Sequence, residues 1–403
     1  MSKKKKGSNF KLLCLFFLCL IQTTAASFGV GGGVGVGIGG GGVWIGGGVN
    51  NGGNRNTVPG SASNNGAYSA LQAWKLAITE DPSGVVKTWV GSDVCSYKGV
   101  FCSGQSITSI DLNHANLKGT IVKDLALLSD LTILHLNSNR FSGQIPDSFK
   151  SLASLQELDL SNNRFSGPFP LVTIYIPNLF YLDLRFNNFS GYVPEELFNK
   201  RLDAILLNNN QFVGELPRNL GNSPASVINL ANNRFSGEIP TSFGLTGSRV
   251  REVLLLNNQL TGCIPESIGM FSEVEVFDVS YNSLMGHVPD TISCLSAIEV
   301  LNLAHNKFSG EVPDLVCSLR SLINLTISFN FFSGISSECS RISFGFDFSG
   351  NCIPGRNSQR PQPDCSGYSG GSLSCLRIPT QPLACAAISV GLKESDNHYT
   401  SSP

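Results

Sequence analysis

The chain has 403 residues, with 28 Lys and Arg against 29 Asp and Glu, and this near-neutral balance offers none of the basic surface that nucleic-acid binding requires. Hydrophobic residues make up 41% of the chain, which excludes wholesale disorder. Only 5 His, 3 Trp and 3 Met are present, so we expect no metal site, no cofactor and no enzyme activity.

The N-terminus has the layout of a secretory signal peptide. Lys3 to Lys6 precede an apolar run of ten residues, Leu12 to Ile21, and small residues follow it. Ten apolar residues are too few to span a bilayer, which needs about 20. We therefore expect residues 1–26 to be removed and the mature chain to be secreted. No later segment is apolar for 18 residues, so the sequence predicts no transmembrane helix.

Two short segments separate the signal from the main part of the chain. Residues 27–66 are rich in glycine and have too few large side chains to offset the entropy of ordering them, so we expect a flexible arm. Residues 67–106 begin with Leu71, Trp74 and Ile78 at helical spacing. A short amphipathic helix of this kind predicts a cap on a larger structure.

Residues 107–353 repeat with a period near 24. Ten units begin at Ile107, Leu131, Leu155, Leu179, Leu202, Ala225, Val250, Val274, Ile298 and Leu322. With the first residue counted as position 0, apolar residues occupy positions 0, 3 and 5, and Pro is frequent at position 15. Gly fills position 12 in all ten units, and Asn fills position 8 in nine, with Ala115 as the exception. A weaker eleventh unit places Asn351 at position 8.

This pattern predicts an α/β solenoid. The alternation around positions 3 and 5 gives one short strand per unit, and stacked units pair these strands into a parallel sheet. Asn at position 8 can donate to and accept from the backbone of a buried turn, where an unpaired group costs about 1–3 kcal/mol. We expect ten to eleven units with capped ends.

The repeat residues resemble the plant-type leucine-rich repeat, and ALQAWKLAITEDPSGVVKTWVGSDVCSYKGVFC resembles the plant N-terminal cap. The segments LTGCIP, FDVSYN, LNLAHNKFSGEVPDLVCSL and GNCIPGRNSQRPQPDC resemble the leucine-rich repeat extensins of plant cell walls. This resemblance implies a wall protein whose repeat domain binds small, secreted, basic, cysteine-rich signalling peptides. The Ser-Pro-Pro-Pro run of that family does not follow Cys365; residues 354–403 form a Cys-containing tail.

The outward strand positions 2, 4, 6 and 7 are the candidate ligand-binding surface, the concave face of such a solenoid. The acids there are Asp111, Glu157, Asp159, Asp183, Glu252 and Asp278, and Arg185 is the one base. Aromatic residues lie between them: Tyr181, Phe186, Tyr281 and Phe329. Acidic groups with exposed aromatics suit a cationic peptide, since charge accelerates association and aromatic contacts supply affinity.

The secreted context also predicts covalent features. Asn188 and Asn324 stand in glycosylation sequons. The cysteines favour disulfides over metal ligands, with Cys95–Cys102, Cys317–Cys339, Cys352–Cys365 and Cys375–Cys385 as the preferred pairs. Cys263 and Cys294 face each other poorly, so their pairing, including a bond between chains or a dimer, stays open.

Two other functions fit the same compartment. Polygalacturonase-inhibiting proteins share the solenoid, but a basic ligand-facing patch would have favoured that defence role, and the patch here is acidic. A structural wall component, associated with wall polymers through its glycine-rich arm, is the other alternative.

Overall fold

The computed structural model describes residues 61–245, 249–337, 339 and 345–366. The chain divides into two units, Met1–Val58 and Pro59–Pro403, and every described residue belongs to the second. The predicted signal peptide and most of the predicted arm therefore lie outside the described residues, as do Cys375 and Cys385 of the predicted tail.

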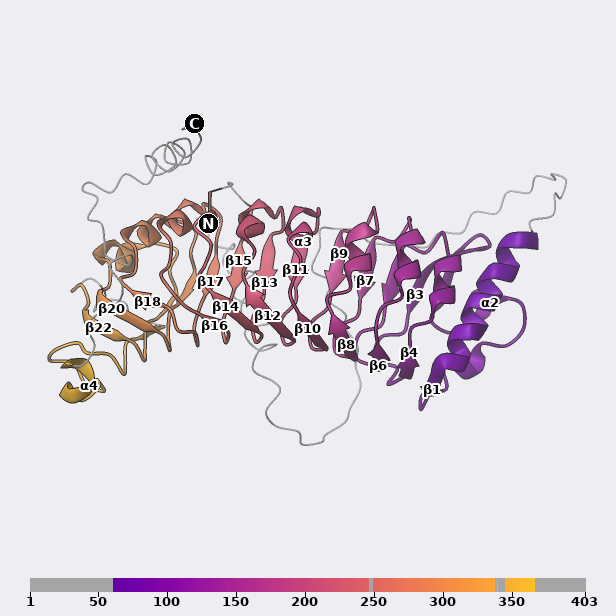
Figure 1. The fold of residues 1–403 in the computed structure, drawn as a ribbon, viewed down its shortest axis with the longest axis horizontal. Helices are drawn as coiled ribbons and strands as arrows, with labels where there is room; N and C mark the ends of the chain where they lie inside the picture. Colours follow the sequence, from indigo (N-terminus) through magenta and orange to yellow (C-terminus); the bar gives the residue numbers. More distant parts are fainter. Residues whose placement is uncertain (1–60, 246–248, 338, 340–344, 367–403) are drawn as a thin grey trace, which may run out of the picture. The chain divides into compact units, whose positions relative to one another are not determined.

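A 12-stranded sheet takes one strand from each repeat and one from the cap. Its strands in spatial order are β2 (Val100–Ser103), β3 (Ser106–Asp111), β5 (Ile133–His135), β7 (Glu157–Asp159), β9 (Tyr181–Asp183), β11 (Ala204–Leu206), β13 (Val227–Asn229), β15 (Glu252–Leu254), β17 (Val276–Asp278), β19 (Val300–Asn302), β21 (Asn324–Thr326) and β23 (Phe346–Asp347). Figure 1 shows the repeats following one another in chain order between α2 and α4. Glu157, Tyr181 and Ala204, each at position 2, are parallel register partners. The predicted leucine-rich repeat solenoid is thus confirmed.

A second row of strands follows the turn after each strand of this sheet. An 8-stranded sheet holds β1 (Ile78–Glu80), β4 (Lys118–Thr120), β6 (Arg140–Gly143), β8 (Arg164–Pro168), β10 (Asn188–Gly191), β12 (Gln211–Glu215), β14 (Arg234–Gly237) and β16 (Gln259–Leu260). A 3-stranded sheet continues with β18 (Met285–Gly286), β20 (Lys307–Glu311) and β22 (Phe331–Gly334).

Short helices complete the repeats. They are the 3₁₀ helices η3 (Lys123–Leu127), η4 (Asp147–Ser151), η5 (Leu171–Tyr175), η6 (Arg218–Asn222), η7 (Glu266–Met270), η8 (Asp290–Cys294) and η9 (Asp314–Ser318), with α3 (Glu196–Asn199) in one repeat. A proline at position 15 stands immediately before six of them, from Pro146 to Pro313. Its fixed φ and missing N–H suit the start of a helix, which explains the recurrent proline.

The N-terminal cap is built on α2 (Ser61–Ala77), which begins earlier than the predicted residue 67. The helix buries Leu71 and Trp74, and η1 (Val86–Thr88) and η2 (Val94–Ser96) follow it. The indole of Trp74 donates to Thr120 O at 3.1 Å. The cap strands β1 and β2 pair antiparallel with β4 and β3, so the cap covers the first repeat on both sheets.

The predicted asparagine ladder links each repeat to the one before it. Asn163 Nδ2 donates to Leu136 O of the preceding repeat at 2.8 Å and to Leu160 O of its own repeat at 3.2 Å. Its Oδ1 accepts from Phe141 N at 2.9 Å. Asn351 makes the same contacts with the last full repeat, so the eleventh unit closes the stack.

Gly at position 12 is explained by backbone conformation and close approach together. Gly214 has φ +93°, which side-chain-bearing residues rarely adopt, and a Cβ there would lie 2.3 Å from the Tyr192 ring. Gly237 has φ +74° and lies under Glu215 in the same way. The residue at position 13 of one repeat therefore rests on the glycine of the next.

Buried aromatic rings run through the first half of the core. Phe141, Phe165, Phe189, Phe212 and Phe235 at position 10 stack with centroid separations of 6.2–6.4 Å. Trp74 of the cap stacks on the first of them at 5.9 Å. The cap and the five repeats that carry these phenylalanines thus share one continuous core.

Disulfides occur at three of the pairs favoured above. Cys95–Cys102, Cys317–Cys339 and Cys352–Cys365 have Cα–Cα separations of 5.7, 4.9 and 5.8 Å. Cys263 and Cys294 are each part of a disulfide as well, so neither is a free thiol. The last of the three pairs ties α4 (Gln362–Ser366) to the end of the solenoid.

Replacing Asn210 by Leu should destabilise the fold by roughly 2–4 kcal/mol, because it leaves Phe189 N, Leu184 O and Leu207 O without their side-chain partner. Chemical unfolding measures the loss. Asn209→Ser is the matched control, since Ser138 already occupies the same position. Equal losses in the two variants would show that position 8 has no special role.

The described cysteines should be inert to alkylation in the native protein, because all eight are disulfide-bonded. Peptide mapping after iodoacetamide treatment, with and without prior reduction, tests this directly. Label at Cys263 or Cys294 without reduction would contradict the structure.

Candidate ligand-binding face

We call the outward surface of the 12-stranded sheet the strand face; it carries the side chains at positions 2, 4, 6 and 7. Position 7 has φ between 52° and 58° in all ten repeats. Asn tolerates this left-handed conformation better than bulky residues do, and it fills the position in four repeats. The aromatic residues Phe186, Tyr281 and Phe329 at this position are therefore unusual and do not arise from the needs of the turn.

Asp183 is not available to a ligand, contrary to the expectation from its position. Its side chain is 0% exposed and forms an ion pair with Arg185, whose Nη2 lies 2.6 Å from Asp183 Oδ2. Arg185 Nε also donates to both carboxylate oxygens at 2.9 Å. The one basic side chain of the predicted face thus neutralises one of its acids and covers it.

Asp159 lies on the neighbouring strand and keeps partial exposure. Its carboxylate accepts from Ser161 Oγ at 2.6 Å. Burial and the nearby Asp183 charge raise the pKa of Asp159. Tyr181 lies on the same surface, at the start of β9. Burial and the Asp183 charge raise the pKa of its hydroxyl well above the usual range.

The first repeats contribute two further predicted acids. Asp111 is exposed. Glu157 is half-buried, and its Oε2 lies 3.0 Å from Nε2 of His135 on the preceding strand. Glu157 thus has His135 as a partner, whereas Asp111 has no basic partner within ion-pair distance among the described residues.

Asp278 is the second predicted acid that the structure removes from the surface. It is 6% exposed, and it accepts from Ser280 Oγ at 2.6 Å and from Asn302 Nδ2 at 3.0 Å. Burial raises its pKa. Like Asp183, it bonds to neighbouring side chains within the face and cannot contact a ligand in this conformation.

An acidic group on three consecutive repeats was only partly predicted. Glu252 at position 2 is joined by Glu275 and Glu299, both at position 1, where the prediction did not look for ligand contacts. Burial and then Glu275 raise the pKa of both Glu252 and Glu299. Arg251 approaches Glu275 only to 4.0 Å, with both side chains exposed. The recurrence of Glu at position 1 in adjacent repeats was the available signal.

The same part of the strand face carries an aromatic stack. The Tyr281 and His305 rings lie 4.1 Å apart, and the His305 and Phe329 rings 4.3 Å apart, both nearly parallel at 13°. Tyr281 is 54% exposed and Phe329 45% exposed. The prediction named the two outer rings but missed His305, which shares position 7. Phe186 stands apart from this stack and is half-buried.

The two sequons lie on different surfaces. Asn188 is exposed at the start of β10. Asn324 is half-buried on the strand face, where its Oδ1 accepts from Thr326 Oγ1 at 3.1 Å. Glycosylation of either residue remains a prediction.

Within the part of the chain that the structure describes, no three His, Cys, Asp or Glu residues are grouped so as to hold a metal ion. No helix in that part combines the length and the apolar composition needed to cross a membrane.

Comparison with known proteins supports both the fold and the wall context. The leucine-rich repeat N-terminal domain model matches residues 64–103, and leucine-rich repeat models match residues 105–165, 178–199, 226–245 and 297–319. Leucine-rich repeat extensin-like protein 6 of Arabidopsis thaliana is 52% identical over 324 residues, covering 78% of this chain and 69% of that protein. Leucine-rich repeat extensin-like proteins 4 and 3 of the same plant are 55% and 63% identical over 150 residues, each match covering 36% of this chain. These two matches span only 30% and 20% of the respective relatives.

Solved structures with the same fold include a peptide-hormone receptor ectodomain and an ice-binding protein. The Arabidopsis receptor kinase HAESA ectodomain, in complex with an N-terminally extended IDA peptide hormone, matches with a TM-score of 0.62 and 29% identity over 71% of this chain and 50% of that one. A plant ice-binding protein matches with a TM-score of 0.58 and 26% identity over 72% of this chain and 97% of that one.

Arg185→Ala should destabilise the protein by roughly 3 kcal/mol, because it leaves the Asp183 carboxylate buried without its ion partner. In an Asp183→Asn background the same substitution should cost clearly less, since no buried charge remains. A double-mutant cycle of unfolding free energies measures the difference. Additive effects would mean that the ion pair contributes nothing.

Proposed function

This chain belongs to the leucine-rich repeat extensin-like family of plant cell-wall proteins, and from that premise we propose that it is a non-enzymatic receptor for a small basic, cysteine-rich peptide. The ligand contacts the strand face. Two groups of side chains on that face form the site: the acids of the first and middle repeats, and the aromatic stack.

The observation that carries the proposal is the excess of accessible acid on the strand face. Asp183 is neutralised by Arg185 and Asp278 is buried, so neither attracts a ligand. Asp111, Glu157 and Asp159 remain in the first repeats, and the middle repeats add a second acidic group. The whole chain is nearly neutral at -1, so this excess is local. The negative electrostatic field of these carboxylates accelerates the encounter with a cationic partner.

Charge repulsion within the middle group supports the same ligand class. The raised pKa values of Glu252 and Glu299 arise from burial and then from the neighbouring Glu275. A bound cation would relieve this repulsion and favour the ionised carboxylates. Groups with such perturbed pKa values cluster at functional sites.

The aromatic stack provides the second component of the site. Tyr281, His305 and Phe329 project from three adjacent strands beyond their carboxyl ends, and the outer two rings are about half exposed. Their edges offer apolar contact area that the turn itself does not require. Aromatic residues of this kind commonly supply much of the binding energy at protein interfaces.

The solved relatives limit what the fold alone can support. The HAESA ectodomain binds a peptide hormone, while an ice-binding protein has the same solenoid. Fold similarity therefore does not select a ligand. The charge and the aromatic residues of this particular face favour a cationic peptide over an ice surface.

Glu157→Gln and Glu252→Gln should each slow association with cationic cysteine-rich peptides by roughly two- to fivefold at low salt, and the effect should shrink at high salt. Phe329→Ala should instead speed dissociation, by roughly fivefold or more, because it removes contact area. Surface-based binding kinetics at two salt concentrations measure both effects. Affinity should also rise as pH increases above 4.5, since the peptide prefers ionised Glu252 and Glu299.

Glu196→Gln is the matched control, because it removes the same charge from an exposed residue of helix α3 and leaves the strand face intact. It should bind as the unmodified protein does. Unchanged kinetics in all three strand-face variants would place the peptide elsewhere and overturn the assignment of this face.

A further inference from the structure

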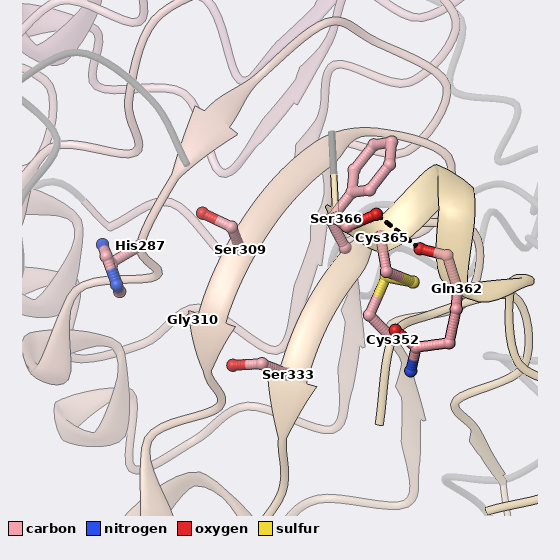
Figure 2. Close-up of a pocket in the computed structure, with 9 residues that line it drawn as sticks. His287, Ser309, Gly310, Ser333, Cys352, Gln362, Cys365 and Ser366 are labelled. Carbon is pink, nitrogen blue, oxygen red and sulfur yellow. Dashed lines mark hydrogen bonds between the residues drawn. A yellow bond between two sulfur atoms is a disulfide. The ribbon is translucent and has the colours of Figure 1, made fainter. Parts of the chain in front are cut away.

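A depression of about 460 Å³ lies at the C-terminal end of the solenoid, on the 3-stranded sheet and not on the strand face. Figure 2 shows His287 on one side of Ser309, Gly310 and Ser333, and the Cys352–Cys365 disulfide with Gln362 and Ser366 on the other. β20 and β22 provide the serines, and α4 forms the opposite wall. The volume falls within the range of small-molecule sites.

Ser309 distinguishes this depression from an ordinary surface hollow. It is 6% exposed, and its Oγ is buried with no hydrogen-bond partner among the described residues. Serines also stand at position 11 in other repeats, and those at 142, 166, 190, 236 and 333 are half-buried or exposed. A buried hydroxyl without a partner is costly, so its presence in the lining points to a partner that arrives from outside.

The lining chemistry indicates an uncharged, hydroxyl-rich ligand. Ser309, Ser333, Ser366, Gln362 and His287 can each donate and accept hydrogen bonds. The residues that line the depression include no carboxylate, Lys or Arg, and Arg360 at its edge is already stacked on the Phe331 ring. The lining itself therefore offers a charged ligand no counter-ion.

Apolar surface completes the lining. The Phe331 ring and the disulfide border the depression. The Arg360 guanidinium lies 4.4 Å from the centre of the Phe331 ring, which fixes the ring at this edge. An aromatic ring beside hydroxyl groups is the combination that receives a sugar, whose C–H face is apolar and whose rim is polar.

We propose that this depression, the C-terminal pocket, binds a neutral sugar unit of a wall polysaccharide or glycan. The Ser309 hydroxyl bonds a sugar hydroxyl, Ser333 and Gln362 contact the solvent-facing rim, and the disulfide holds α4 in place as the second wall. This site is independent of the proposed peptide site, because it lies on the 3-stranded sheet, whereas the peptide site lies on the 12-stranded sheet.

Ser309→Ala should lower the affinity for a neutral oligosaccharide by roughly three- to tenfold, the effect of losing one hydrogen bond. Ser309→Leu, which fills the pocket, should abolish binding. Ser236→Ala is the matched control, since it changes the same position of another repeat. The probes are oligosaccharides of xyloglucan, xylan, galactan and arabinan, with oligogalacturonide as the charged comparison, titrated calorimetrically into the full secreted chain.

Folding and binding can be separated in this experiment. Because Ser309 Oγ has no described internal partner, Ser309→Ala should leave the thermal midpoint unchanged or raise it. A large loss of stability would show an internal role and overturn the premise. Binding of no neutral probe, binding of oligogalacturonide alone, or neutral binding that survives Ser309→Leu would each overturn the proposal. Peptide binding should be unaffected by every Ser309 variant. If the unmodified chain binds no peptide, that result overturns the strand-face proposal and leaves the pocket proposal untouched.

Discussion

The buried turn that follows each strand sets the main constraint on this protein. Its backbone N–H and C=O groups are removed from water, and in every repeat after the first a single asparagine pairs them with its own repeat and with the previous one. Asn163 illustrates the arrangement, with Leu136 O and Leu160 O as acceptors and Phe141 N as donor. No repeat can satisfy its turn alone, so the units are stable only when stacked. The parallel sheet, the glycine contacts and the capping helix all follow from that stack.

Because the inward positions are fixed by the stack, the outward positions are the ones free to vary in charge and size. The outward surface has one part around Asp183 and Arg185, where a buried ion pair compensates the charge, and another around Glu252, Glu275 and Glu299, where three carboxylates have one exposed arginine, Arg251, beside them at 4.0 Å from Glu275. The first rigidifies the surface, while the second leaves like charges close together. The aromatic stack shares two of its three repeats with Glu275 and Glu299, so acidic charge and aromatic contact area lie in the same half of the solenoid.

Periodicity alone was enough to predict the fold, since Asn at position 8 and Gly at position 12 have direct mechanical roles. The site was less accessible to sequence. Asp159, Asp183 and Asp278 share position 4, yet their exposure differs because it depends on which neighbour covers each one, as Arg185 covers Asp183. Glu275 and Glu299 lie outside the simple in–out alternation of a strand. The C-terminal pocket depends on where a disulfide places α4, which no repeat pattern encodes.

The left-handed backbone at position 7 has a consequence for how such proteins diversify. Asn, Ser, His, Phe and Tyr all occur there with nearly the same φ, so the turn accepts very different side chains without moving. The residue that stabilises the turn, at position 8, is the next one along the chain. The residue that stabilises the turn and the residue that varies on the surface are thus neighbours in the sequence. Substitutions at position 7 can therefore change the surface of one repeat at a time while the asparagine ladder stays intact.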